Sequence, residues 1–310
     1  MKCAGLTAAK KQRFQCLVCR VTFVHTNKLN HWQRTRVWFE RWIREGYSIR
    51  QLMEQSNHSR RSLQQIISYW LQHPPVVIQT FLHVRSIILD GTYIEKRRQG
   101  AFVCLDGTSN EVIEGVYGIK EGSKEMFEML LTLKHQGLSP KSATIDGLPA
   151  VFKCLKQIWP EIIIQRCVVH IQRQGLMWCR RFPKRTDAKA LRRLFLRVTD
   201  ITSKETEESF LSDVKVWEER YGSRLASTTE QGWVISDLRR ARTVLLNALP
   251  NMFHYLDDPS IPKSTNAIEG YFSIMKGLYR RHRGISRSHR SSYFQWYFFF
   301  GKRRSSNTKR

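Results

Sequence analysis

The spacing of apolar residues between residues 34 and 73 is helical and falls into three segments. The first helix is expected to end at Gly46, because glycine readily ends a helix. Ser48 and Ser59 stand where the N-caps of the second and third helices are expected. In the third helix the apolar positions recur three and four residues apart, at Leu63, Ile66, Ile67, Trp70 and Leu71. The pattern therefore predicts a small three-helix unit.

The opposite face of the third helix is polar and basic. It presents four side chains that suit a recognition helix in the major groove of DNA: Arg60, Arg61, Gln64 and Ser68. A small helical bundle with a solvated basic face is the alternative. The tight spacing of the helices and the composition of this face favour a helix-turn-helix domain over residues 34–75.

After residue 80 the pattern changes to short apolar runs separated by glycines. We expect a buried strand over 84–94 that ends at Asp90, followed by a hairpin over 100–120. A helix, a short strand, a second helix and another buried strand follow over 123–167. The order β-β-β-α-β-α-β predicts an α/β fold: one mixed sheet of three antiparallel strands extended by parallel crossovers and flanked by helices.

Strand signals disappear between residues 183 and 262, where three long segments carry helical periodicity. We therefore expect an all-helical insertion between the last strand and the helix that bears Glu269. The chain is expected to comprise a partial zinc-ribbon-like segment at 1–33, the helix-turn-helix domain at 34–75, the first part of the core at 80–182, the helical insertion at 183–262, and the completion of the core with a basic tail at 263–310.

Cys16 and Cys19 form a Cys-x2-Cys pair between aromatic and β-prone residues. This spacing is half of a zinc ribbon, whereas a closed structural zinc site needs four ligands. No second pair follows, and the available substitutes are Cys3, His25 and His31. Either these residues complete a zinc site, or the start of the ribbon is missing. We favour the loss, because ribbons usually bind zinc through two such pairs.

The charge balance is strongly basic, since 52 Lys and Arg against 26 Asp and Glu give a formal net charge of +26. A surplus spread along the whole chain favours a polyanionic partner over a merely solvated face. A membrane protein is not indicated: there is no apolar run near the roughly 20 residues of a span, and no strongly amphipathic basic helix. Seven cysteines without framework spacing fit reduced thiols, so we expect a cytoplasmic protein that binds nucleic acid.

Asp90 and Asp146 each occupy the predicted end of a strand, and each is followed by glycine. If the strands are neighbours, their ends lie about 4.8 Å apart, and Glu269 on a helix against the sheet completes a group of three acids. Such carboxylates repel unless cations lie between them. Mg²⁺ prefers oxygen ligands, and two ions about 3.5–4 Å apart activate a nucleophile and stabilise the leaving oxygen. Asp-Gly is also an ordinary turn signal, as at Asp106, and that interpretation stays open for both residues.

The helix around Glu269 carries an apolar and a polar stripe. The apolar stripe comprises Ile268, Tyr271, Phe272, Met275 and Tyr279, and the polar stripe comprises Glu269, Ser273, Lys276 and Arg280. An acid followed by cations on the same face suits a helix that holds metal and DNA phosphates together. Lys276 and Arg280 are therefore candidate phosphate contacts.

Three blocks of the chain, ILDGTYI, ATIDGLPAVFKCLKQIWPEIIIQRCVVHIQRQ and STNAIEGYFSIMKGLYRRHRGIS, resemble the DDE transposases of bacterial insertion sequences related to Mutator-like elements. The resemblance runs from about residue 80 to 302. It implies an RNase H-like core with a helical insertion, and Asp90, Asp146 and Glu269 as catalytic metal ligands. Cys167 and His170 match the family's Cys-x2-His pair, which implies a place near the site; a hydrogen-bonded helix histidine is the alternative for His170.

The resemblance also implies the partners and the reaction. The implied partner is DNA, both the terminal inverted repeats and the target. The implied protein is a homo-oligomer on DNA, with two Mg²⁺ or Mn²⁺ ions as cofactor. Our hypothesis is hydrolysis at the element ends followed by attack of the freed 3′-hydroxyl on target DNA, in the cytoplasm or, in a bacterium, at the nucleoid. Two alternatives are an element-derived DNA-binding regulator without catalysis and an RNase H-like nuclease without strand transfer.

Overall fold

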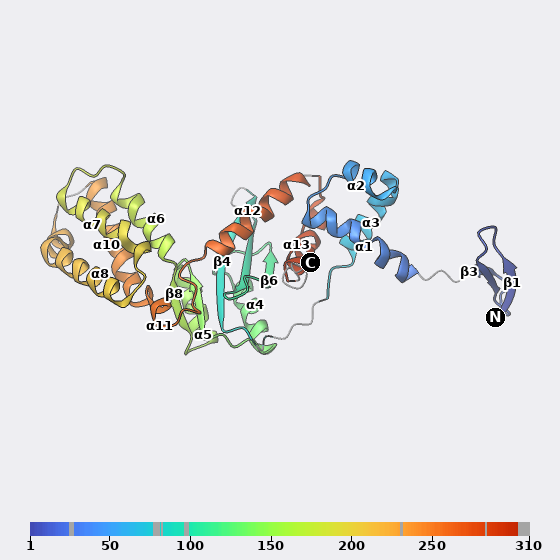
Figure 1. The fold of residues 1–310 in the computed structure, drawn as a ribbon, viewed down its shortest axis with the longest axis horizontal. Helices are drawn as coiled ribbons and strands as arrows, with labels where there is room; N and C mark the ends of the chain where they lie inside the picture. Colours follow the sequence, from blue (N-terminus) through green and yellow to red (C-terminus); the bar gives the residue numbers. More distant parts are fainter. Residues whose placement is uncertain are drawn as a thin grey trace. The chain divides into compact units, whose positions relative to one another are not determined.

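The structure, a computed structural model, describes residues 1–24, 28–76, 81, 83–95, 99–229, 232–282 and 284–302. The chain divides into two compact units, residues 1–73 and 74–310 (Figure 1). His25 and the basic tail at 303–310 lie outside the described residues. Among the helices of the described ranges, none combines the length and the apolar character that crossing a membrane requires.

The first unit begins with a small antiparallel sheet in the order β1 (Lys2–Leu6), β2 (Gln12–Gln15) and β3 (Thr22–Val24). Cys16 and Cys19 lie in the turn between β2 and β3. The Cys16 N–H donates to the Val21 carbonyl at 3.0 Å, and the Arg20 N–H donates to the Cys16 carbonyl at 3.0 Å. These two bonds close the turn, so the Cys-x2-Cys pair is presented on a compact loop.

Three helices complete the first unit: α1 (Lys28–Arg44), α2 (Ile49–Ser56) and α3 (Arg60–Gln72). Ser48 and Ser59 cap α2 and α3 through their side-chain oxygens, as predicted. α1 begins at Lys28 rather than at residue 34, and Trp32 in its early part stacks on Tyr69 of α3 with ring centroids 4.0 Å apart. The predicted boundary after residue 33 therefore lies inside α1, because a tertiary contact supports a helix start that local sequence does not announce.

The second unit contains a five-stranded mixed sheet in the order β6-β5-β4-β7-β8. The strands are β4 (Ser86–Glu95), β5 (Gln99–Asp106), β6 (Val112–Tyr117), β7 (Ser142–Ile145) and β8 (Ile163–Arg166). β4, β5 and β6 pair antiparallel, whereas β7 pairs parallel with β4 and with β8. This confirms the predicted mixed α/β sheet and its order of elements.

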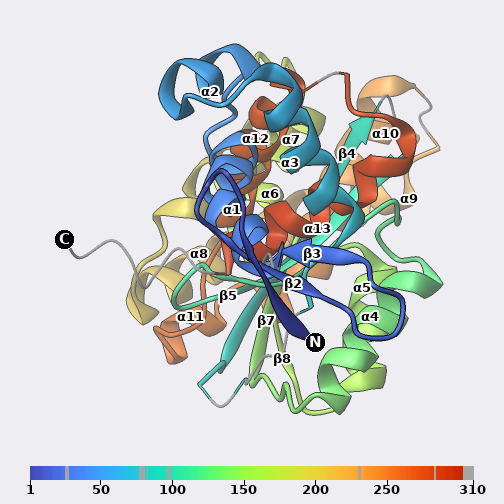
Figure 2. The same cartoon turned by 90° about the vertical axis from the view of Figure 1, so that its right-hand side faces the viewer.

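Helices cover both faces of this sheet (Figures 1 and 2). On one face, α4 (Lys124–His135) and α5 (Pro149–Ile158) pack on a core that includes Ile87 and Leu89 of β4. On the other face lie α12 (Asn266–Arg281), which contacts β4, and α13 (Arg287–Gly301), which contacts β6. Because side chains alternate along a strand, Asp90 points away from the Ile87 and Leu89 face, toward the α12 side.

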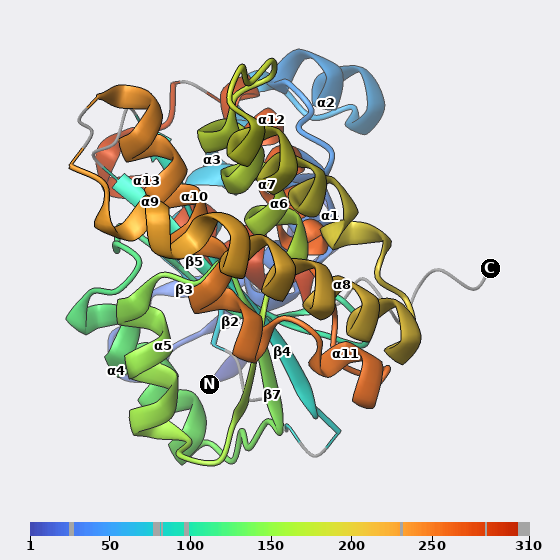
Figure 3. The same cartoon turned by 90° about the vertical axis from the view of Figure 1, so that its left-hand side faces the viewer.

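A second hydrophobic core joins the remaining helices, which gather beside the sheet (Figure 3). These are α6 (Val168–Cys179), α7 (Thr186–Arg197), α8 (Lys204–Trp217), α9 (Ser223–Ser227), α10 (Trp233–Ala248) and α11 (His254–Asp257), with a π-helical turn over Glu218–Gly222. The described residues of 183–262 contain no strand, as predicted. α6 shares this second core, so the helical part extends to before residue 183.

Candidate metal centre

Asp90 lies in the middle of β4, not at its end as predicted. β4 pairs with β7 only as far as Ile88, because β7 is short and ends at Ile145. Its antiparallel partner β5 continues, and there Asp90 lies opposite Val103. The strand is therefore extended past Asp90, but Asp90 stands just beyond the last residue of β4 that pairs with β7.

Asp146 follows the last residue of β7 directly, so the two acids lie on neighbouring strands as expected. Its Oδ1 accepts a hydrogen bond from the Leu148 N–H at 2.9 Å. Gly147 adopts φ +104°, a conformation that glycine reaches without strain. Asp146 therefore does occupy a turn, and this turn fixes the carboxylate at the edge of the sheet.

A third acid, Glu121, joins Asp90 and Asp146. The carboxylate oxygens of the three residues lie within 4.8 Å of one another, and Asp90 is buried. Glu121 comes from the loop between β6 and α4, and its side chain lies over Gly91. A Cβ at position 91 would stand 2.9 Å from Glu121 Oε2, so the glycine after Asp90 makes room for this acid.

The three carboxylates raise one another's proton affinity. Burial first, and then the charge of Asp146, raise the pKa of Asp90 to about 7. Burial, then the charges of Asp146 and Asp90, raise the pKa of Glu121 to about 8. Within the described part of the chain, none of the three forms an ion pair with a cationic side chain. A group of carboxylate oxygens without an ion-pair partner fits a hard divalent cation such as Mg²⁺.

Glu269, in the first turn of α12, is not part of this group. Arg173 Nη1 donates to both of its carboxylate oxygens, at 2.9 and 2.8 Å, and His170 Nε2 lies 3.6 Å from Oε1. After burial and Asp146, the charge of Glu269 also contributes to the raised pKa of Asp90. The structure therefore brings two of the three predicted acids together and holds the third nearby through Arg173 and His170.

Cys167 and His170 join the start of α6 to the start of α12. The N–H of Thr265, the residue before α12, donates to Cys167 Sγ at 3.3 Å. Thr265 Oγ1 lies 3.4 Å from the same sulfur and 3.2 Å from His170 Nδ1. The hydrogen bond with Cys167 is the main reason why the pKa of His170 is raised to about 9. His170 is thus both a hydrogen-bonded helix histidine and a neighbour of Glu269.

Sequence reasoning missed three residues here: Glu121, Arg173 and Thr265. Glu121 is followed by Gly122, as Asp90 and Asp146 are by their glycines, so the same acid-glycine signal was present. It did not discriminate, because several other acids in the chain also precede glycine. Glu121 follows β6, two strands away from β4, and only the path of its loop brings it to Asp90.

The predicted DNA contacts lie on two helices. On α3, Arg60, Arg61 and Gln64 are exposed, and Ser68 is half-buried. On α12, Arg280 is exposed, whereas Lys276 is half-buried and its Nζ donates to Thr92 Oγ1 at 2.5 Å.

Lys276 lies close to the carboxylate group. Burial and then Arg280 lower its pKa, and the charge of Asp90 acts in the opposite direction. A cation therefore stands beside Asp90 on the α12 face of the sheet.

The Cys16 and Cys19 pair has no further ligand within the described residues. Hydrogen bonds from the backbone of Cys19 and Val18 lower the pKa of Cys16, and Cys3 is exposed on β1. The group of Asp90, Glu121 and Asp146 is the single set of three or more potential metal ligands in the described ranges. The loss of a ribbon and a site completed by residues such as His25 both stay predictions.

Comparison with known proteins identifies the family of the chain. Residues 85–281 match the family model described as "Transposase, Mutator family". The chain is also similar to the transposase for insertion sequence element ISRM3 of Rhizobium meliloti (strain 1021), at 27% identity over 155 residues, which cover 48% of this chain and 36% of that protein. The chain thus spans about a third of the length of this curated relative. Because the family match covers more than half of its residues, including all four acids above, the chain belongs to the Mutator family of transposases.

Proposed function

We propose that the protein is an insertion-sequence transposase that cuts and rejoins DNA at a divalent-metal site built on Asp90 and Asp146. The observation that carries this proposal is the carboxylate group at the edge of the sheet, in which no member forms an ion pair with a cationic side chain within the described residues. The sheet order, with three antiparallel strands continued by two parallel ones, supports an RNase H-like core of the DDE type.

In this proposal Asp90, Asp146 and Glu121 bind the cations through their carboxylate oxygens, and Glu269 belongs to the same catalytic set. Two Mg²⁺ or Mn²⁺ ions, when bound, would polarise the scissile phosphate and lower the pKa of the attacking water or 3′-hydroxyl. Arg173 and His170 orient Glu269 beside the group. Lys276, next to Asp90, contacts a phosphate of the strand being cut, and Arg280 contacts the following DNA backbone.

The first unit supplies DNA recognition in this proposal. We assign α2 and α3 to a helix-turn-helix whose exposed Arg60, Arg61 and Gln64, with Ser68, read the terminal inverted repeats. Two capped helices separated by three residues support this assignment. We assign the turn with Cys16 and Cys19 to the remnant of a zinc ribbon. The active form on DNA is a homo-oligomer, and its place is the cytoplasm, at the nucleoid in a bacterium.

Cleavage of DNA by substituted proteins tests this function. Asp90→Asn and Asp146→Asn each remove a ligand charge while keeping side-chain size, so both should abolish Mg²⁺-dependent cleavage and leave DNA binding in place. Asp106→Asn, in the hairpin turn of the same sheet, is the matched control and should cleave like the unsubstituted protein. A protein that binds DNA but never cleaves it, with or without these changes, would instead favour the regulator.

A further inference from the structure

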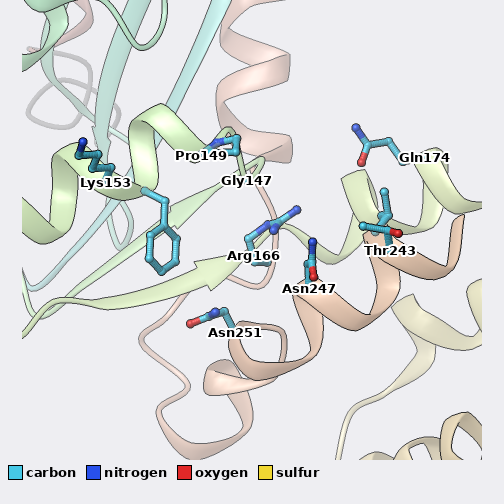
Figure 4. A pocket seen from close by; sticks show the side chains of 10 residues that line it. Gly147, Pro149, Lys153, Arg166, Gln174, Thr243, Asn247 and Asn251 are labelled. Carbon is cyan, nitrogen blue, oxygen red and sulfur yellow. The ribbon is translucent and has the colours of Figure 1, made fainter. Parts of the chain in front are cut away.

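A pocket of about 420 Å³ opens one residue away from Asp146, between α5 and α10. Its lining includes Gly147, Lys153, Arg166, Asn247 and Asn251. Figure 4 shows Arg166 in the middle of this lining, with Pro149 and Lys153 of α5 to one side and Thr243 and Asn247 of α10 to the other. The volume lies within the range of roughly 300–1,000 Å³ that is usual for small-ligand sites.

The backbone around Asp146 is shaped to admit Arg166. Arg166 is the last residue of β8 and pairs with Ile145, directly before Asp146. A Cβ at position 147 would stand 1.9 Å from the guanidinium carbon, so a side chain there would displace Arg166. Gly147 is therefore needed twice, for its positive φ and for this close approach.

The guanidinium of Arg166 has unused hydrogen-bonding capacity. Its Nε is buried and has no hydrogen-bond partner among the described residues. A buried donor without a partner is costly, and Arg is the side chain best suited to a phosphate. Lys153 adds a second cation, and none of the described lining residues is acidic.

The rest of the lining suits a nucleobase. Gln174, Asn247 and Asn251 carry amides that make no side-chain hydrogen bond within the described part of the chain. Amides pair with the donor and acceptor edges of bases. Phe152 supplies an aromatic side chain to the same pocket, and enzymes that hold an unpaired base commonly use this combination.

We propose that this pocket binds one unpaired nucleotide of the DNA strand next to the cleavage point, with its phosphate at Arg166 and its base edge at Asn247 and Asn251. The proposal rests on the proposed function, because it takes the carboxylate group to be the place where DNA is cut. The pocket begins at the residue that follows Asp146, so a strand held at Asp146 passes its mouth. The helical insertion thereby acquires a role, since α10 supplies three of the ten lining residues, Thr243, Val244 and Asn247.

The test compares two short duplexes that differ in one feature. One carries a single unpaired thiothymidine in its centre, and the other carries the same photoreactive base paired with adenine. The unsubstituted protein should bind the bulged duplex at least about fivefold more tightly, which is the lower end of what contacts to one base contribute. Irradiation should crosslink the unpaired base to peptides of α5 or α10, as identified by mass spectrometry.

Asn247→Ala combined with Asn251→Ala should reduce the affinity ratio to about one and remove the crosslink, while affinity for the paired duplex is retained. Gln157→Ala, on α5 but outside this pocket, is the matched control and should keep the ratio. Equal binding of both duplexes by the unsubstituted protein, or a ratio that survives the double substitution, overturns the nucleotide pocket and leaves DNA cleavage standing. A protein that binds neither duplex overturns the proposed function together with this inference.

Discussion

Cys167 and Thr265 are 98 residues apart in the chain and are joined in the fold by the Thr265 N–H, which donates to the cysteine sulfur at 3.3 Å. Cys167 precedes α6 and Thr265 precedes α12, so this contact fixes the two helices that carry His170, Arg173 and Glu269. Both residues are fully buried. The Cys-x2-His pair is therefore explained as a link between the sheet and α12, the helix that carries Glu269.

Replacing the sulfur should loosen that link. Cys167→Ala leaves the buried Thr265 N–H without an acceptor, which should lower the free energy of unfolding by about 1–3 kcal/mol. Cys167→Ser keeps an acceptor and should cost less. Urea denaturation of the two variants measures the difference. Equal losses for Ala and Ser would mean that the sulfur only fills space.

Arg173 neutralises Glu269 and so reduces the negative charge near the carboxylate group. Arg173→Gln should therefore lower, by a few-fold, the Mg²⁺ concentration needed for half-maximal thermal stabilisation. Stability without metal should change by roughly 0 to 1 kcal/mol, because the Arg173 side chain is exposed. Arg197→Gln removes another exposed ion pair, with Asp213, and serves as the control. An unchanged or higher Mg²⁺ requirement in Arg173→Gln contradicts this role.

Glu121 is the acid that the structure adds to the predicted set. Glu121→Gln should raise the Mg²⁺ concentration required for thermal stabilisation at least several-fold, because it removes one carboxylate ligand. Glu125→Gln, at the exposed start of α4, should leave that requirement unchanged. Identical Mg²⁺ titrations for both variants would remove Glu121 from the site.

The raised pKa values predict how stability depends on pH without metal. Asp90 and Glu121 bind protons more tightly in the folded state, with pKa values of about 7 and 8 against ordinary values of 3.8 and 4.5. Their contribution to stability is complete below the ordinary values and is lost as pH rises through the folded ones. Melting temperatures should therefore fall between about pH 4 and 8, and stabilisation by Mg²⁺ should grow over the same interval. A doubly substituted Asp90→Asn, Glu121→Gln protein should show a flatter profile; an equally steep one contradicts the assignment.

We expect the first unit to recognise the DNA sequence and the second unit to contact the phosphates. Arg61→Ala with Gln64→Ala should shrink the ratio of specific to non-specific DNA affinity, since such contacts to bases contribute about 1–3 kcal/mol each. Lys276→Ala with Arg280→Ala should weaken binding to all duplexes and flatten the salt dependence by about 0.9 units of slope per lost contact. Titrations of terminal and random duplexes at several salt concentrations distinguish the two. If the Arg61 and Gln64 variant loses affinity for terminal and random duplexes equally, α3 is only a basic surface and does not read the DNA sequence.

Helices and strands could be predicted from the local sequence wherever an N-cap residue or a regular spacing of apolar residues marks them. Ser48 and Ser59 cap helices as predicted, and the run of strands was recognisable from its apolar residues. The early start of α1 was not recognisable from the sequence, because it is accompanied by a stacking contact between Trp32 and the distant Tyr69. The local sequence therefore does not predict a helix boundary that depends on a contact with a distant residue.

The candidate site shows the same division. Asp146 was predictable because it follows the end of β7, and Asp90 because it lies on the neighbouring strand, just beyond the last residue of β4 that pairs with β7. Glu121 depends on the path of a loop, and the Arg173 partner of Glu269 depends on a side-chain contact between α6 and α12; no local pattern encodes either. The strand was predicted to end at Asp90 for a related reason, since its continuation to Glu95 depends on pairing with β5.

A Mn²⁺ titration of the purified protein, followed by the electron paramagnetic resonance signal of free Mn²⁺, tests whether the carboxylate group binds a divalent cation. The unsubstituted protein and Asp106→Asn should both withdraw Mn²⁺ from solution, whereas Asp146→Asn should bind it much more weakly, because one of the three grouped carboxylates is lost. Equal Mn²⁺ binding by Asp146→Asn and the unsubstituted protein, or no binding by either, would contradict a metal centre at these carboxylates.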